Sequence, residues 1–490
     1  MVSPPTSVPL APVGAGGEEA PARDPRRWLV LGICCTSLFI VGLDNTAVNV
    51  ALPDLRRDLG ASTAELQWSV SAYTLVLASL LMLSGSTADR IGRARMFQIG
   101  LTLFSLGSLL CSVAPNVELL IVFRMLQGVG GSMLNPVAMS IIRNTFDDPR
   151  ERAQAIGVWG GVIGLSMAFG PIVGGGLVEA VDWRAIFWIN VPVGAVALIL
   201  TRRYVPESRA PHARRVDPVG QLLVIVLLAS TVFAIIQAPD AGWTSVQTLG
   251  LLVLAAVALT ALVAYESRHR EPLIDPRFFR SAPFAGASLI AVLAFVSLGG
   301  FLFLNTLYLQ EARGLSPLHA GLYTLPMAAT TVVVGPLTGR LVGRFGTRWS
   351  LALGGAAIVL SALMLTGLER DTSVAWLFGS YVLFGVGFGS VNPPITNTAV
   401  SGMPADQAGV ASAVASTSRQ VGSSLGVAIL GAVAVGTATS GTAVAASSHP
   451  GWWIVAGCAV AIVVLSFAST GAWARGTAER AAASFRARPS

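Results

Sequence analysis

Long apolar stretches alternate along this chain with short polar segments that carry arginine, proline and glycine. Each apolar stretch has about 20 residues or more, which is the length that an α-helix needs to cross roughly 30 Å of hydrocarbon. We therefore expect an all-α polytopic membrane protein. The pattern predicts fourteen transmembrane helices, at 28–51, 67–88, 96–114, 117–142, 153–179, 184–204, 218–237, 247–266, 284–310, 317–340, 349–367, 374–399, 407–437 and 452–473.

The composition supports a membrane environment and narrows the possible functions. Of 490 residues, 53% are hydrophobic and 12% are charged, whereas a soluble domain carries about 25% charged residues. The net charge of +7 does not indicate nucleic-acid binding, because the arginines are spread between apolar stretches and form no basic patch. The sequence contains no Lys, which a Walker A loop requires. Uphill work is therefore expected to be driven by a gradient or by another subunit.

Cysteine and histidine give no indication of a metal site. The four cysteines lie in predicted helices, and the four histidines are scattered, three in predicted loops and His319 at the start of the helix predicted at 317–340. Neither set has the spacing of metal ligands. We expect no metal and no cofactor.

The arginines are distributed unevenly between the two sides of the membrane. If the N-terminus is cytoplasmic, the cytoplasmic segments hold 25 of the 32 arginines and the external loops hold five. Cytoplasmic loops of membrane proteins carry an excess of positive charge, so both termini are predicted to be cytoplasmic. The remaining two arginines, Arg124 and Arg419, lie inside predicted helices.

A short motif occurs twice in the predicted cytoplasmic loops. Residues 85–93 read GSTADRIGR and residues 339–347 read GRLVGRFGT, with Gly, Arg and Gly at matching offsets. The two copies are eight helices apart, which predicts two six-helix halves with two further helices between them, a repeat typical of secondary transporters. The predicted segments are a disordered cytoplasmic N-terminus at 1–27, an N-terminal bundle at 28–204, two inserted helices with flanking loops at 205–283, a C-terminal bundle at 284–473 and a cytoplasmic tail at 474–490.

Four segments carry a family resemblance. They are LDNTAVNVALP at 43–53, the loop at 85–93, RMLQGVGG at 124–131 and GLSMAFGPIVGG at 164–175. Further matching segments are DWR at 182–184, NVP at 190–192, YLQ at 308–310, GLSP at 314–317, AG at 320–321 and RQVG at 419–422. In this order, over nearly the whole chain, they resemble the major facilitator superfamily, and within it the fourteen-helix drug:proton antiporters of the EmrB/QacA type.

The resemblance implies the major facilitator fold and a proton-coupled antiporter. Such a protein would export drugs, antibiotics or other amphipathic small molecules from the cytoplasm by alternating access, without enzymatic activity. The expected location is the bacterial inner membrane. The expected partners are a small-molecule substrate, protons and the lipid bilayer, with no nucleic acid and a monomeric state.

Asp44 and Arg124 are buried charges at similar predicted depths. Each lies about seven residues from the external end of its helix, or roughly 10 Å below the outer surface. A charge inside the membrane is costly without a partner and marks a functional site, so we expect the two side chains to interact. The resemblance makes them the proton-coupling residues: Asp44 binds a proton when Arg124 moves away and releases it when Arg124 returns. The alternative is a static ion pair that aligns two helices.

The resemblance assigns two further sets of residues to the movement between conformations. The signature loop comprises Gly85, Asp89, Arg90, Gly92 and Arg93. Within it, Asp89 and Arg93 are expected to make ionic contacts that hold the cytoplasmic gate closed. The antiporter motif comprises Gly164, Gly170, Pro171, Gly174 and Gly175. Its glycines allow close helix packing and its proline loosens the helix, so we expect this motif to seal and hinge.

Several polar residues inside the predicted helices are candidates for lining a substrate cavity. They are Asn45, Asn49, Gln127, Asn135, Asn305, Gln310, Asn392, Asn397 and Arg419. Contacts between helices are the alternative role for about half of them, and for Arg419. No Asp or Glu lies well inside the last six predicted helices. We therefore expect neutral, zwitterionic or anionic aromatic substrates rather than dications.

The alternatives to export are import and an intramembrane enzyme or receptor. A proton-coupled importer could use the same fold, but the Gly/Pro motif at 164–175 is typical of exporters. An intramembrane enzyme or receptor would need paired acids, a metal set or an activated nucleophile. The predicted helices contain no such set, and the longest loops have only about twenty residues.

Overall fold

The computed structural model describes residues 26–146, 148–210, 216–269, 271–401, 403, 407–434 and 441–486. All regular elements in these residues are helical. Except for Arg26 and Arg27, the predicted disordered segment 1–27 lies outside the described residues.

The first half of the chain forms seven helices. They are α1 (Arg27–Leu59), α2 (Thr63–Ile91), α3 (Arg93–Ser112), α4 (Val117–Thr145), α5 (Pro149–Ala180), α6 (Ala185–Trp188) and α7 (Asn190–Tyr204). Glycine separates the first three: Gly60 (φ 63°) ends α1, and Gly92 (φ 117°) lies between α2 and α3. Such backbone angles favour glycine because it has no Cβ.

The remaining helices follow in chain order. They are α8 (Pro218–Ala241), α9 (Val246–Glu266), a 3₁₀ turn (Pro276–Arg280), α10 (Ala282–Leu307), a π turn (Tyr308–Ala312), α11 (Pro317–Tyr323), α12 (Leu325–Phe345), α13 (Thr347–Leu365), α14 (Val374–Val400), α15 (Ala408–Ala434), α16 (Gly441–Thr470) and α17 (Ala472–Arg486).

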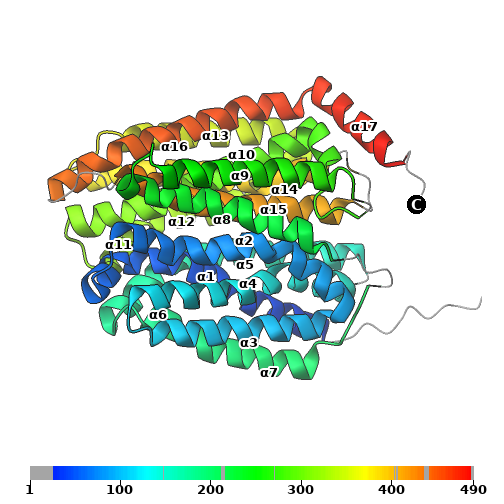
Figure 1. Ribbon diagram of the computed structural model, residues 1–490, viewed down its shortest axis with the longest axis horizontal. Coiled ribbons are helices and arrows are strands. Elements are labelled where there is room, and N and C mark those ends of the chain that lie inside the picture. Colours follow the sequence, from blue (N-terminus) through cyan, green and yellow to red (C-terminus); the bar gives the residue numbers. More distant parts are fainter. Residues whose placement is uncertain are drawn as a thin grey trace, which may run out of the picture.

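The helices lie roughly side by side in two groups (Figure 1). Helices α1–α7, coloured blue to cyan-green, occupy one half of the view, and α10–α16 occupy the other. The groups meet where α2 packs against α15 and where α5 packs against α11 and α12. Helix α8 touches α2 and α15 and therefore covers this seam, whereas α9 packs mainly on α8.

Most of the helices are suited to a bilayer. Twelve described helices are long and apolar enough to cross a membrane, or thirteen if the two parts of α5, bent by 41°, form one span. The protein is therefore a multi-pass membrane protein, as predicted. Helix α15 is not among the twelve, so the count of fourteen stays a prediction. The orientation in the membrane also stays a prediction.

Four predicted helices differ from the observed ones by more than four residues at one end or are broken. The helix predicted at 452–473 begins earlier and forms α16 (Gly441–Thr470). Helix α1 continues to Leu59, beyond the predicted end at 51, so Arg56 and Arg57 lie in its last turn and not in a loop. The stretch 184–204 is broken into α6 and α7, and the stretch 317–340 into α11 and α12. Hydropathy does not detect these breaks because each is short and lies within a stretch that is apolar on average.

The C-terminal segment 474–490 was predicted as a tail without assigned structure. It contains most of α17, which projects from one end of the bundle (Figure 1). This helix buries Ala474, Ala478 and Ala481 and exposes Arg475 and Arg480. The spacing of the buried residues is that of an amphipathic helix.

Candidate functional site

Asp44 on α1 and Arg124 on α4 form a buried ion pair. Arg124 Nη1 donates to Asp44 Oδ2 at 2.6 Å, and the two residues are 1% and 0% exposed. The structure thus brings together the two residues whose predicted depths matched. A hydrogen bond between two ionised groups is about twice as strong as a neutral one.

Neutral side chains complete the coordination of Asp44. Its Oδ1 accepts hydrogen bonds from Gln127 Nε2 and from Asn190 Nδ2, both at 2.9 Å. Arg124 is held in turn by the Ser69 carbonyl, which accepts from Nε at 3.0 Å. Asp44 therefore accepts hydrogen bonds from three residues on two helices besides its own, and both of its carboxylate oxygens have partners.

The ion pair lies next to a cavity. The ring of Tyr73 is 4.4 Å from Arg124 Cζ, a cation–π contact, and the same tyrosine lines the cavity. Asn45 and Thr46, which follow Asp44 on α1, also line it. Tyr73, Asn45 and Thr46 therefore connect the cavity wall directly with the ion pair, so a movement of the wall can shift Asp44 or Arg124.

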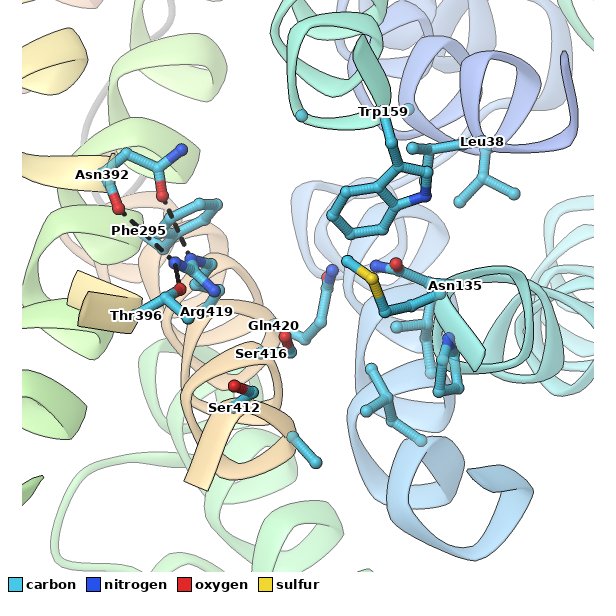
Figure 2. A pocket seen from close by; sticks show the side chains of 18 of the residues that line it. Leu38, Asn135, Trp159, Phe295, Asn392, Thr396, Ser412, Ser416, Arg419 and Gln420 are labelled. Carbon is cyan, nitrogen blue, oxygen red and sulfur yellow. Dashed lines mark hydrogen bonds between the residues drawn. The ribbon is translucent and has the colours of Figure 1, made fainter. Parts of the chain in front are cut away.

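The cavity has a volume of about 1280 Å³ and lies between the two groups of helices. Its walls come from α1, α2, α4 and α5 on one side and from α10, α12, α14 and α15 on the other. Figure 2 shows the two walls facing each other, with Arg419 and Gln420 on one and Trp159 and Asn135 on the other. The lining reaches Asp89, Arg143 and Glu271 at the predicted cytoplasmic ends of the helices. The cavity therefore opens toward that side.

The predicted cavity residues divide into two groups. Asn45, Asn135, Asn392 and Arg419 line the cavity. Asn49, Gln127, Asn305, Gln310 and Asn397 do not. Gln127 binds Asp44, Asn305 accepts from the Tyr381 hydroxyl, and Asn397 is exposed.

The glycines of the antiporter motif lie where α5 meets other helices. Gly170 and Gly174 contact Thr46 and Ala47 of α1. Gly175 contacts the backbone of Pro317 at the start of α11, where a Cβ would find no room. The surroundings of Gly164 lie outside the described part of the structure.

Polar contacts join the two groups of helices at the predicted external end, and we call them the outer closure. Gln310 Nε2 donates to the Val50 carbonyl at 2.8 Å. Glu179 accepts from the Ser316 hydroxyl at 2.6 Å and from the backbone N–H of Leu318 at 3.1 Å. An ion pair of 2.8 Å links Arg56 and Glu311. The structure is therefore closed on this side and open on the other.

The signature loop is organised by a carboxylate that sequence analysis missed. Glu207, in the segment after α7, accepts from the backbone N–H groups of Ala94 and Arg95 at 3.0 and 3.1 Å. Asp89 and Arg93 pair with each other at 2.9 Å, so in this conformation their ion pair stays within the first group of helices. Arg90 is exposed. No sequence motif marks Glu207, because it is one acid in a polar linker.

One substitution tests the close packing at the outer closure. In Gly175→Ala the new methyl group meets the Pro317 backbone, so α5 and α11 should separate and open the cavity to the outside more often. The expected result is several-fold faster labelling of an introduced Asn45→Cys by a membrane-impermeant maleimide added to intact cells. Gly176→Ala is the matched control, since its Cβ would meet only Leu318 Cδ1 at 3.7 Å. Equal labelling of the two variants would contradict this account.

Two helical groups around a central cavity that is open at one end define a membrane transporter rather than an enzyme. The sequence matches the model of the Major Facilitator Superfamily over residues 34–427. The chain belongs to this superfamily and is a multi-pass protein of the bacterial inner membrane.

Several curated relatives are resistance proteins. The chain is 40% identical to the Multidrug resistance protein Stp of Mycobacterium tuberculosis over 81% of its own length and 74% of the relative's. It is 37% identical to the Tetracenomycin C resistance and export protein of Streptomyces glaucescens, over 86% of this chain and 78% of the relative. For the Multidrug efflux pump LfrA of Mycolicibacterium smegmatis the identity is 35%, over 85% and 83%.

Solved structures share the fold at low sequence identity. A bacterial homologue of the human lysosomal transporter Spinster, in an inward-facing and occupied conformation, has a TM-score of 0.64 at 17% identity, over 96% of this chain and 100% of the other. The peptide transporter POT in complex with sulfate has a TM-score of 0.66 at 15% identity, over 93% and 95%. These likenesses concern the fold alone.

Proposed function

We propose that this protein exports drugs or other amphipathic small molecules from the cytoplasm in exchange for protons. The observation that carries the proposal is the buried Asp44–Arg124 ion pair, one residue away from the wall of a cavity of about 1280 Å³. The resistance and export functions named for its relatives support the direction of transport.

The proposed cycle alternates the access of the cavity. In the present conformation the outer closure is formed and the cavity reaches the predicted cytoplasmic ends of the helices, so a substrate would enter from the cytoplasm. Separation of α5 from α11 and approach of the opposite ends would then expose the cavity to the outside. This rigid-body movement is the mode by which transporters of this architecture operate.

Asp44 would carry the proton. While Arg124 donates to it at 2.6 Å, Asp44 stays ionised. If α1 and α4 shift so that the ion pair breaks, the buried carboxylate loses its counter-charge and binds a proton. Gln127 and Asn190 can keep their contacts with the uncharged group, because amide N–H groups also donate to a carbonyl oxygen.

The driving force is adequate for concentrative export. One proton that crosses a potential of about 100 mV contributes ~2.3 kcal/mol. Since ~1.4 kcal/mol corresponds to a tenfold concentration ratio, one proton per neutral substrate supports a gradient of about 50-fold.

Everted membrane vesicles separate export from import. Acidification of the vesicle interior should drive uptake of a fluorescent aromatic compound, either 1-pyrenebutyrate or its neutral amide, and collapse of the gradient with nigericin should stop it. Vesicles without the protein are the control. Uptake that does not depend on the proton gradient, or movement of the compound out of the vesicles under the same gradient, would show that the protein is not a proton-driven exporter.

A further inference from the structure

Arg419 lies in the cavity wall, near the middle of α15. Neutral groups of α14 hold its guanidinium: Nε donates to Asn392 Oδ1 at 3.1 Å, and Nη2 donates to the Thr396 hydroxyl at 2.7 Å and to the Asn392 carbonyl at 3.4 Å. Figure 2 shows these contacts on one wall of the cavity. They fix the orientation of the guanidinium without neutralising its charge.

No carboxylate in the described part of the chain forms an ion pair with Arg419. Arg124, the other intramembrane arginine, is paired with Asp44. The remaining charged residues of the lining are at or beyond helix ends near the opening of the cavity, and they are Asp89, Arg93, Arg143, Asp217 and Glu271. The deep part of the cavity therefore has one positive charge and no negative one among its described lining residues.

One nitrogen of this guanidinium is available to a ligand. Nη1 donates to no described protein atom. The protein does not enclose this nitrogen completely. It is therefore accessible from the cavity. An arginine N–H binds anionic oxygen more strongly than neutral oxygen, and a charge inside the membrane gains most from a counter-charge. Gln420 projects into the cavity beside it and offers an amide (Figure 2).

Apolar side chains surround this charge. Trp159 and Leu38 lie on the opposite wall, and Phe295 lies beside Arg419 (Figure 2). Phe295 packs edge-to-face against Phe388 at 5.3 Å between ring centroids, and both line the cavity. Pockets that bind drug-sized ligands have volumes of about 300–1,000 Å³, so a cavity of about 1280 Å³ accommodates a body of several fused rings.

We propose that Arg419 anchors an anionic group of the exported compound, a carboxylate or an acidic phenol, while the aromatic body of that compound packs between Trp159 and Phe295. The proposal rests on the export function proposed above and names the class of compound that the same cavity takes. The anion supplies the counter-charge that the deep part of the cavity lacks.

A binding titration with two matched probes tests this anchor. The purified full-length protein is titrated with 1-pyrenebutyrate and with its neutral amide, and pyrene fluorescence reports binding. The wild type should bind the carboxylate at least about tenfold more tightly, which corresponds to ~1.4 kcal/mol. Arg419→Gln should remove this preference, and Arg419→Lys should keep part of it, because Lys retains the charge but not the planar fork.

The control is Arg370→Gln, which removes the same charge from an exposed turn outside the cavity and should leave the preference unchanged. Equal affinity for the two probes, no affinity for the carboxylate, or a preference that survives in Arg419→Gln overturns the proposal. The titration needs no proton gradient, so it is independent of proton coupling. In everted vesicles, failure of the export function would abolish transport of both probes by the wild type without changing their binding.

Discussion

Asp44→Asn should abolish concentrative export while leaving substrate binding intact. The amide has nearly the same shape and still accepts from Gln127 and Asn190, but it cannot bind and release a proton. The steady-state ratio of a neutral substrate across the vesicle membrane should fall from about 50-fold to near one. Exchange of labelled for unlabelled substrate without a gradient should continue. The measurement is drug uptake into everted vesicles with and without an imposed gradient.

Asp54→Asn is the matched control for this experiment. Asp54 lies on the same helix and pairs with Arg57, whose side chain is 72% exposed. Loss of the Asp54 charge should therefore leave export unchanged. If Asp44→Asn still concentrates the drug to the wild-type level, the ion pair is a static contact between α1 and α4 and the proton is carried elsewhere.

Arg124→Gln should lower the free energy of unfolding by about 3–5 kcal/mol. Removal of one partner from a buried ion pair leaves the other charge without compensation, and here Asp44 is 1% exposed. The double variant Asp44→Asn/Arg124→Gln should recover part of the loss, because it leaves no buried charge. Thermal and denaturant unfolding in detergent, followed by circular dichroism, measures the difference.

A surface ion pair provides the comparison. Arg57→Gln breaks the exposed contact with Asp54, and such pairs contribute only about 0–1 kcal/mol. A single variant Arg124→Gln as stable as Arg57→Gln would contradict the view that Arg124 compensates a buried carboxylate.

The approach of Asp44 to Arg124 could be predicted from the sequence because depth in a membrane follows from position along a helix. Each is the only charge well inside its apolar stretch, and counting residues from the predicted ends of the two stretches places them at one depth, although α1 continues beyond its predicted end to Leu59. The other partners of Asp44 could not be predicted in this way. Asn190 reaches the carboxylate from the first residue of α7, and the break between α6 and α7 has no hydropathy signal.

The side of a helix that a polar residue occupies depends on how the helix is rotated against its neighbours. For this reason Asn45 and Asn135 line the cavity, whereas Asn49 and Asn305 are buried between helices. Gln310 lies in a π turn and reaches α1 at the outer closure, a contact that only the packed structure reveals. Long apolar stretches predict where helices lie along the chain, and tertiary packing decides how these helices are rotated and which residues meet.

Drug-driven proton release from reconstituted proteoliposomes tests the central claim most directly. Substrate is added on one side of the membrane without an imposed gradient, and a pH-sensitive dye records protons on the other. We predict that the wild type moves protons opposite to the substrate and that Asp44→Asn moves none, although it still binds the substrate. Unchanged proton movement in Asp44→Asn would contradict the assignment of proton coupling to the Asp44–Arg124 ion pair.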